Sequence, residues 1–202
     1  MTNKIRWKIL VLGFSMVLLS TVLLGGILSW TIVSQAKSDI IKFEETAIKK
    51  RKQELKEKSD LAYSAIRTLY TDAVEMRSHG ITVPESQITK NMISLINKLR
   101  FGEDKNEYFW IHSYNENDQT DITMIMHPVI PSMQGDNLSE LRYTSGNLIG
   151  EIVYATGINE KIPFVRYMNK IVSREGGGFV SYDWPRPIQS GLTEYQPKIS
   201  YV

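Results

Sequence analysis

The stretch Tyr108-Phe109-Trp110-Ile111-His112 marks the point where the chain changes from helical to extended periodicity. After Arg100 the aromatic content rises and apolar side chains alternate with a period of two, which is typical of β-strands. We predict one strand at residues 108–112 and a second at residues 122–127, with the polar cluster Asn115-Glu116-Asn117-Asp118 as the turn between them. Pro128 ends the second strand, because proline cannot donate a hydrogen bond to a strand ladder.

Two helices and two further strands are predicted downstream. The helices lie near residues 148–156 and 163–174, and the glycine run at residues 176–178 ends the second of them. The strands occupy residues 179–184 and 198–202. The loop predicted between these two strands contains Pro185, Pro187 and Gly191.

A long helix is predicted upstream, at residues 37–79, because no Gly or Pro interrupts an apolar repeat with a strict seven-residue interval. The repeat consists of Ile41, Ile48, Leu55, Ala62, Leu69 and Met76. A second apolar seam appears only in the later half, so this half should lie on a core, whereas the first half should be a solvated stalk or a dimer seam. Gly80 suits a left-handed cap. Residues 82–85, Thr-Val-Pro-Glu, then have the spacing of a capping box before a second, shorter helix.

Charge and cysteine content exclude several classes of function. The mixed charges from Lys49 to Lys58 are interpreted as a solvated helix face with ion pairs four residues apart, not as a membrane-surface or nucleic-acid patch. The net charge of +2 gives no indication of nucleic acid as a partner. Without cysteine, the chain has neither a disulfide scaffold nor a thiol nucleophile.

Residues 9–33 are apolar or small and contain no charged side chain, and Lys4, Arg6 and Lys8 precede them. At about 1.5 Å of rise per residue, a helix of this length crosses a hydrocarbon core of about 30 Å, so we predict a transmembrane helix. A cleaved signal peptide is the alternative, because residues 34–36, Ser-Gln-Ala, resemble a cleavage site. Residues 1–8 are then expected to be a cytoplasmic tail and residues 34–202 one extracytoplasmic domain, although charge alone leaves the orientation open.

Five short motifs, in their order along the chain, resemble the single Cache sensor domain. Such domains lie outside the cytoplasmic membrane in bacterial receptors, most often methyl-accepting chemotaxis proteins and sensor histidine kinases. The motifs are Tyr-Phe-Trp-Ile at 108–111, Met-Ile-Met-His-Pro at 124–128, Gly-Asp-Asn-Leu at 135–138, Gly-Phe-Val-Ser-Tyr-Asp-Trp-Pro at 178–185 and Pro-Lys-Ile-Ser-Tyr-Val at 197–202. The resemblance covers residues 35–202 and implies an α+β fold, with a PAS-like antiparallel sheet packed on a long N-terminal helix and a ligand pocket on the other face of the sheet.

The resemblance also implies a ligand class and an output. Members of this branch are commonly receptors for small carboxylates such as acetate, propionate, pyruvate or lactate. Residues 152–163 form a longer segment than is usual in the family. The chain stops at Val202, before the last strand, the second membrane span and the cytoplasmic signalling part that the resemblance implies, so we expect a C-terminally truncated receptor.

Strand alternation alone also predicts a pocket. In the strand at residues 108–112, alternation places Tyr108, Trp110 and His112 on one face. In the strand at residues 179–184, Tyr182 and Trp184 share a face, and in the strand at residues 198–202, Lys198 and Ser200 do. If these phases align, one sheet face combines aromatic walls with histidine and lysine donors, which suits a small anion. The predicted ligand-binding residues are Tyr108, Trp110, His127, Tyr182, Trp184 and Lys198.

Each of these residues also has a structural alternative. The aromatic residues suit a core, His127 could be a satisfied core histidine, and Lys198 could be an exposed edge lysine. Arg100, Arg142 and Arg186 are alternative carboxylate clamps by chemistry, and nothing in their spacing selects one.

Catalytic and metal sites have little support in the sequence. His112, Asp121 and His127 lack the spacing of a zinc site, so we expect neither a metal ion nor a cofactor. The glycine run at residues 176–178 follows a helix instead of opening one, unlike a phosphate loop. No pair of carboxylates is singled out for acid and base roles, and an enzyme is not expected.

We therefore predict a receptor of the inner cell membrane that is anchored in the lipid bilayer and dimeric through the long helix. It binds a small organic acid and signals to a cytoplasmic output module, most often in chemotaxis. One alternative is the input domain of a sensor histidine kinase or a cyclase. Others are an interaction module whose pocket is filled by its own side chains and an anchored extracytoplasmic enzyme.

Overall fold

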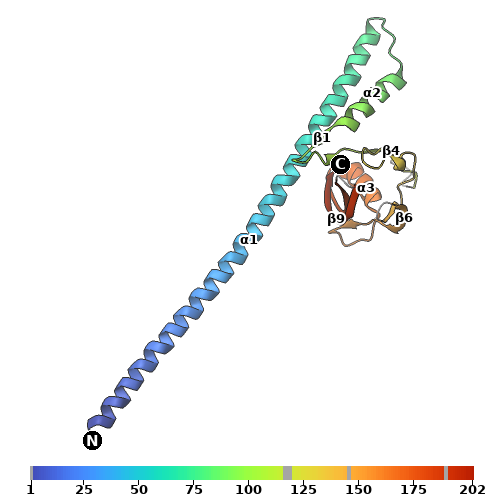
Figure 1. Cartoon of the computed structure of the whole chain (residues 1–202). Helices are drawn as coiled ribbons and strands as arrows, with labels where there is room; N and C mark the ends of the chain where they lie inside the picture. The colour runs from blue at the N-terminus through green and yellow to red at the C-terminus, as the bar shows by residue number, and fades with distance from the viewer. Residues whose placement is uncertain (1, 116–119, 145–146, 189–190) are drawn as a thin grey trace. The chain divides into compact units, whose positions relative to one another are not determined.

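The computed structural model describes residues 2–115, 120–144, 147–188 and 191–202, which form an α+β protein with antiparallel strand pairs (Figure 1). The chain divides into two compact units, residues 1–51 and residues 52–202. The helices are α1 (Thr2–Ser78), α2 (Glu85–Lys98) and α3 (Phe164–Glu175), with one 3₁₀ turn, η1 (Pro131–Met133). The strands are β1 (Arg100–Phe101), β2 (Glu107–Tyr108), β3 (Ile111–His112), β4 (Met124–Met126), β5 (Arg142–Thr144), β6 (Asn147–Ile152), β7 (Ala155–Thr156), β8 (Phe179–Ile188) and β9 (Gly191–Tyr201).

The first unit consists of helix α1 as far as residue 51. Its most apolar window has a mean hydropathy of 2.3, and none of that window is buried. By length and composition this part of α1 is able to cross a membrane. The predicted membrane span and the predicted long helix are one continuous helix, because residues 34–36 contain no helix breaker.

In the second unit, α2 runs back beside the later part of α1 (Figure 1). Ala62 of α1 packs with Ile96 of α2 and Met126 of β4 in a small apolar cluster, which confirms that this half of α1 lies on a core. Partly buried side chains complete this cluster, namely Ile66, Ile93, Leu99, Phe109 and Ile111. The predicted dimer seam therefore includes at least one residue, Ala62, that is used for packing within the chain.

The turn between α1 and α2 differs from its prediction in one detail. Gly80 has the expected positive φ of 80°. The capping box is wrong, because residue Pro84 occupies the N-cap position of α2 and makes no side-chain cap bond. Instead, the Arg77 guanidinium donates hydrogen bonds to the carbonyl of Val83 and to the Glu85 carboxylate, each at 2.8 Å.

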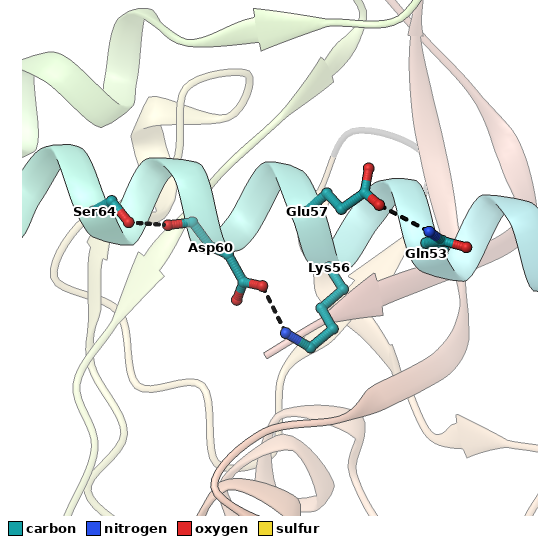
Figure 2. Close-up of polar contacts among 5 residues, drawn as sticks. All are labelled: Gln53, Lys56, Glu57, Asp60 and Ser64. Carbon is teal, nitrogen blue, oxygen red and sulfur yellow. Dashed lines mark hydrogen bonds and ion pairs between the residues drawn. The ribbon is translucent and has the colours of Figure 1, made fainter.

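The charged face of α1 carries an ion pair of the predicted kind, between residues four positions apart (Figure 2). The Lys56 ammonium lies 2.6 Å from the Asp60 carboxylate, and the Gln53 amide donates to Glu57 at 2.9 Å. The Ser64 hydroxyl donates to the backbone carbonyl of Asp60. These pairs are solvated, so their support of the helix is small.

The predicted strand at residues 108–112 is two short strands with different partners. Residues of β2 pair with β1, and residues of β3 pair with β4. The single-strand prediction is wrong because the chain changes partner at Phe109-Trp110, yet the alternation of faces is kept. Phe109 and Ile111 pack on the Ala62 cluster, whereas the rings of Tyr108 and Trp110 contact His127.

The predicted helix at residues 148–156 is wrong. Residues Asn147–Ile152 form β6, which pairs with β5, and Ala155–Thr156 form β7, which pairs with β8. The segment contains β-branched residues and a glycine, which are poor helix formers, and Val153 donates its backbone N–H to the Leu141 carbonyl at 3.0 Å. The next helix, α3, is confirmed, and Gly176 closes it with a φ of 72°.

Strands β7, β8 and β9 form the largest sheet, in that order. The predicted loop at Pro185 and Pro187 is wrong, because β8 continues through both prolines to Ile188 and pairs with β9. Strand β7 pairs with only Tyr182 and Ser181 of β8, so no β7 partner needs the N–H that the prolines lack. The predicted turn at residues 115–118 lies, apart from Asn115, outside the described residues.

The main core lies between this sheet, α3 and β4. Helix α3 contributes Phe164, Val165, Met168 and Ile171, all of which are buried. Val180, Tyr182 and Trp184 of β8 face them on alternate positions. The fully buried members of this core also include Ile122, Met124, Met133 and Leu138.

Candidate functional site

The β8–β9 ladder determines where Lys198 lies. Lys198 pairs with Tyr182, and two residues further Ser200 pairs with Val180. The Lys198 ammonium donates a hydrogen bond to the Tyr108 hydroxyl at 3.2 Å. It also lies 4.4 Å from the centre of the Tyr108 ring and 6.0 Å from that of Tyr182. Two tyrosine rings from different strands therefore hold one ammonium by cation–π contact.

Lys198 is half-buried and lines the aromatic cavity. Burial lowers the pKa of Lys198 to about 8, and the negative charge of Glu107 opposes this change. The ion pairs found among the described residues do not include Lys198. A half-buried ammonium whose hydrogen-bond partner is a neutral phenol favours an anion beside it.

His127 is buried at the end of β4, where its ring nitrogen is bound to the backbone. The Nδ1 atom accepts hydrogen bonds from the N–H of Ile130 at 2.9 Å and of Val129 at 3.3 Å. Burial, followed by the charges of Lys198 and Arg100, lowers the pKa of His127 to about 3. The imidazole is therefore neutral at physiological pH with its proton on Nε2, which makes it a neutral donor.

Aromatic rings surround this histidine. Tyr108 meets the His127 ring edge-on at 5.1 Å between centroids, and the centroids of Trp110 and Trp184 lie 6.3 Å and 6.2 Å from it. Tyr182 shares a hydrogen bond of 2.7 Å with the Ser200 hydroxyl, and burial raises the pKa of this tyrosine. The phenol of Tyr182 therefore stays neutral.

These side chains enclose one cavity. Its lining consists of Trp110, Met124, His127, Met133, Leu141, Phe164, Tyr182, Trp184 and Lys198. The free volume, measured with a water-sized sphere, is about 10 Å³, which is about the space that one water molecule needs. The lining is apolar apart from the ammonium, the imidazole and one phenol.

The structure brings all six predicted binding residues together. Five of them line the cavity, and the sixth, Tyr108, holds the lysine. His112 is predicted on the same face as Tyr108. Its ring lies 5.0 Å from that of Trp110 in a tilted arrangement, and it is not among the residues that line the cavity.

None of the three alternative arginine clamps lines the cavity. Arg186 lies 3.4 Å from Asp104, and Arg142 is exposed. Arg100 donates to the backbone carbonyls of Asn97 and Leu99.

Four residues that line the cavity were not predicted from the sequence, namely Met124, Met133, Leu141 and Phe164. Each is buried and apolar, so its sequence pattern is that of a core residue. No signal in the chain separates an apolar cavity wall from the core around it. Among the described residues, no three His, Cys, Asp or Glu side chains gather into a group that could hold a metal ion.

Comparison with known proteins assigns the family. The family model described as "Cache domain" matches residues 30–202. This chain belongs to the Cache domain family. Among solved structures, the chain is similar to one described as the periplasmic sensor domain of a chemotaxis protein, with a TM-score of 0.55 and 24% identity, over 77% of this chain and 86% of that one. That likeness supports the Cache fold.

Curated relatives of this Cache domain are signalling proteins. The sensor histidine kinase MctS of Rhizobium johnstonii is 23% identical over 98% of this chain. The methyl-accepting chemotaxis protein McpP of Pseudomonas putida is 26% identical over 60% of it. The chain spans only 35% and 18% of the lengths of these relatives.

Proposed function

We propose that this Cache domain is the ligand-binding part of a transmembrane signalling receptor and that its ligand is a small organic acid. The observation that carries the proposal is the half-buried Lys198 ammonium at the wall of an aromatic cavity. A carboxylate beside it would gain a charge-assisted hydrogen bond in surroundings of low dielectric constant.

Each predicted binding residue has a role in this proposal. Lys198 pairs with the carboxylate, and the Tyr108 hydroxyl holds the ammonium in place. The Nε2–H of His127 is the second donor. Trp110, Tyr182 and Trp184 enclose the apolar end of the ligand.

The small cavity restricts the proposed ligand to one of few atoms, in the class of acetate, propionate, pyruvate or lactate. The free volume is about 10 Å³, so a ligand of this size enters only as side chains move. Met124 and Met133 are in the lining, and methionine has the flexible, unbranched side chain that permits such movement.

The placement of the domain is also a proposal. The apolar start of α1 would anchor the protein in the inner membrane, with residues 1–8 in the cytoplasm and the Cache domain outside. Both curated relatives are signalling proteins, which supports a cytoplasmic output module, and chemotaxis or a kinase are the two outputs that they represent. Two copies would associate through the exposed part of the α1 repeat, which includes Ile41 and Ile48.

A binding titration tests the proposal. The full chain, in lipid nanodiscs, would be titrated with propionate by calorimetry, with propionamide as the uncharged control. Wild type is expected to bind propionate and not propionamide, and Lys198→Met is expected to lose binding. Lys90→Met removes an exposed lysine of α2 and serves as the matched control.

One observation favours a second function. A cavity of about 10 Å³ is nearly filled by its own side chains, as expected of an interaction module that takes no ligand. That function predicts no heat with propionate, acetate, pyruvate or lactate, and no difference between Lys198→Met and Lys90→Met. The same titration therefore decides between the two.

A further inference from the structure

The short strand β2 has two faces with different partners. Its residues Glu107 and Tyr108 are neighbours in an extended strand, so their side chains point to opposite sides. Tyr108 accepts the hydrogen bond from Lys198 at the cavity. On the other side, the Glu107 carboxylate lies 3.8 Å from the ammonium of Lys58 on helix α1.

Lys58 has a second contact with the two-stranded ribbon that β1 and β2 form. Its ammonium lies 4.5 Å from the centre of the Phe101 ring, and Phe101 is the β1 residue that pairs with Glu107. An ion pair and a cation–π contact therefore hold one lysine of α1 on both strands of the ribbon.

The position of Glu107 is restricted by the turn that joins β1 to β2. Its side chain lies over Gly102, where an added Cβ would come within 2.9 Å of the carboxyl carbon. Gly102 also has a φ of +82°, which favours glycine. The Glu107 carboxylate thus lies between helix α1 and its own strand, β2, which also carries Tyr108.

We propose that β2 links the cavity to helix α1, because Tyr108 of this strand accepts the hydrogen bond of Lys198 on one side and Glu107 pairs with Lys58 on the other. The link rests on the proposed function, since the signal that it carries is the negative charge of a ligand. Glu107 and Lys58 are positioning residues in this proposal and do not touch the ligand.

Electrostatics determine the direction of the effect. An anion beside Lys198 adds negative charge on the cavity side of β2, which repels Glu107 and attracts Lys58. Lys58 therefore stabilises the bound state more than the free state. By linkage, a bound anion holds Lys58, and with it this turn of α1, more firmly on the ribbon. Because the Lys58 and Glu107 side chains are 32% and 27% exposed, solvent screens the pair and the effect is about two- to fivefold in affinity.

The first test is propionate affinity of the full chain in lipid nanodiscs. Lys58→Met keeps the apolar stem and removes the charge, and it is expected to weaken binding about two- to fivefold. Lys52→Met is the matched control, because Lys52 of the same helix contacts the Phe179 ring at 5.3 Å instead of β2. In a Glu107→Gln background, Lys58→Met should weaken binding less than it does in wild type, because Lys58 has then lost its ion-pair partner on β2, as a double-mutant cycle would show. Equal affinities for Lys58→Met and Lys52→Met would overturn the link.

The second test needs no ligand. The pKa of Lys198 would be measured by ¹³C NMR of its labelled Cε in the same nanodiscs. The charged and titratable groups around Lys198 are Glu107, Tyr108, His127 and Tyr182. Glu107→Gln should lower the pKa, because the charge of Glu107 raises it, and Lys58→Met should raise the pKa.

The two tests separate two failures. Absence of propionate binding in wild type, with the pKa changes as expected, would contradict the proposed function and leave the link through β2 intact. Binding in wild type, with the pKa of Lys198 unchanged in both variants, would contradict the link alone.

Discussion

The two faces of the segment at residues 108–111 bury different kinds of side chain. Phe109 and Ile111 pack on an apolar cluster that includes Ala62 and Ile96. Tyr108 and Trp110 face a cavity that contains a histidine and a lysine. The first face stabilises the fold by burial, whereas the second keeps an ammonium in surroundings that destabilise it.

This contrast shows that the Lys198 ammonium lowers the stability of the fold. An apolar residue at position 198 would pack in the cavity wall without burying a charge, just as the apolar side chains of the Ala62 cluster pack without one. An ammonium at the wall of a cavity therefore supports the proposed binding site more than it supports the fold. The predictions below test the two faces, from the largest effect to the smallest.

On the apolar face, a charge should unfold the domain. Ile96 is 3% exposed, so Ile96→Asp is expected to lower the free energy of unfolding by about 4 kcal/mol or more. Ile81→Asp is the control, because Ile81 is 56% exposed, and its effect should stay within about 0.5 kcal/mol. Urea unfolding followed by circular dichroism measures both, and similar losses would refute the assignment of this face as core.

On the cavity face, removal of a charge should stabilise the domain. The pKa of Lys198 is lowered from 10.5 to about 8, so Lys198→Met should raise the free energy of unfolding at pH 7 by at most about 3 kcal/mol. Between pH 8 and 10.5 the unfolded state holds more protons than the folded state, so wild-type stability should rise with pH in this window. The variant should lack that rise. A destabilised Lys198→Met would mean that the ammonium supports the fold.

His127 should make the cavity face sensitive to acid. Its pKa is lowered from 6.5 to about 3, so the unfolded state binds a proton below pH 6.5 that the folded state does not. Stability is full above pH 6.5 and should fall by about 1.4 kcal/mol per pH unit below it, or about 2 kcal/mol from pH 6 to 4.5. His127→Asn should flatten this slope in urea unfolding at several pH values. Replacement of the exposed His79 by Asn should leave the slope as it is in wild type.

Two tyrosine hydroxyls of the cavity should have separate effects. Tyr182→Phe removes the bond to Ser200 and should cost about 1 kcal/mol of stability with little change in propionate affinity. Tyr108→Phe removes the acceptor of the Lys198 ammonium and should weaken propionate binding. Calorimetry and urea unfolding of both variants measure the difference. The reverse result would assign the positioning of the lysine to Tyr182.

The sequence is sufficient to predict which side chains share a face, and the wrong predictions of strands and helices have physical causes. The alternation at residues 108–111 was sufficient to assign side chains to faces, because a period of two survives a change of strand partner. It was not sufficient to show that β2 and β3 pair with different strands, since pairing depends on residues far away in the chain. The segment at residues 148–156 was predicted as a helix because its apolar spacing is ambiguous, and its pairing with β5 and β8 decided against it.

The residues predicted for the candidate site include the polar and the strand-borne aromatic side chains at the cavity, but not four apolar ones that line it. Lys198 and His127 stand out in the sequence because both belong to the strand motifs and can donate hydrogen bonds to a small anion. Met124, Met133, Leu141 and Phe164 have no such signal. The contact between Lys58 and Glu107 was also not predicted, because a lysine within a run of charges on α1 has the pattern of a solvated residue.

The irregularity near the tip of the β8–β9 hairpin has a consequence for how the protein can change in evolution. The ladder is regular from Phe179 and Tyr201 up to Pro185 and Tyr195, and the register shifts only between Pro185 and Pro187. A one-residue slip across the regular part would put Pro197 or Ile199 in the place of Lys198. Since the shift separates the tip from the cross-strand pair of Lys198 and Tyr182, the tip can gain or lose a residue while the lysine stays at the cavity.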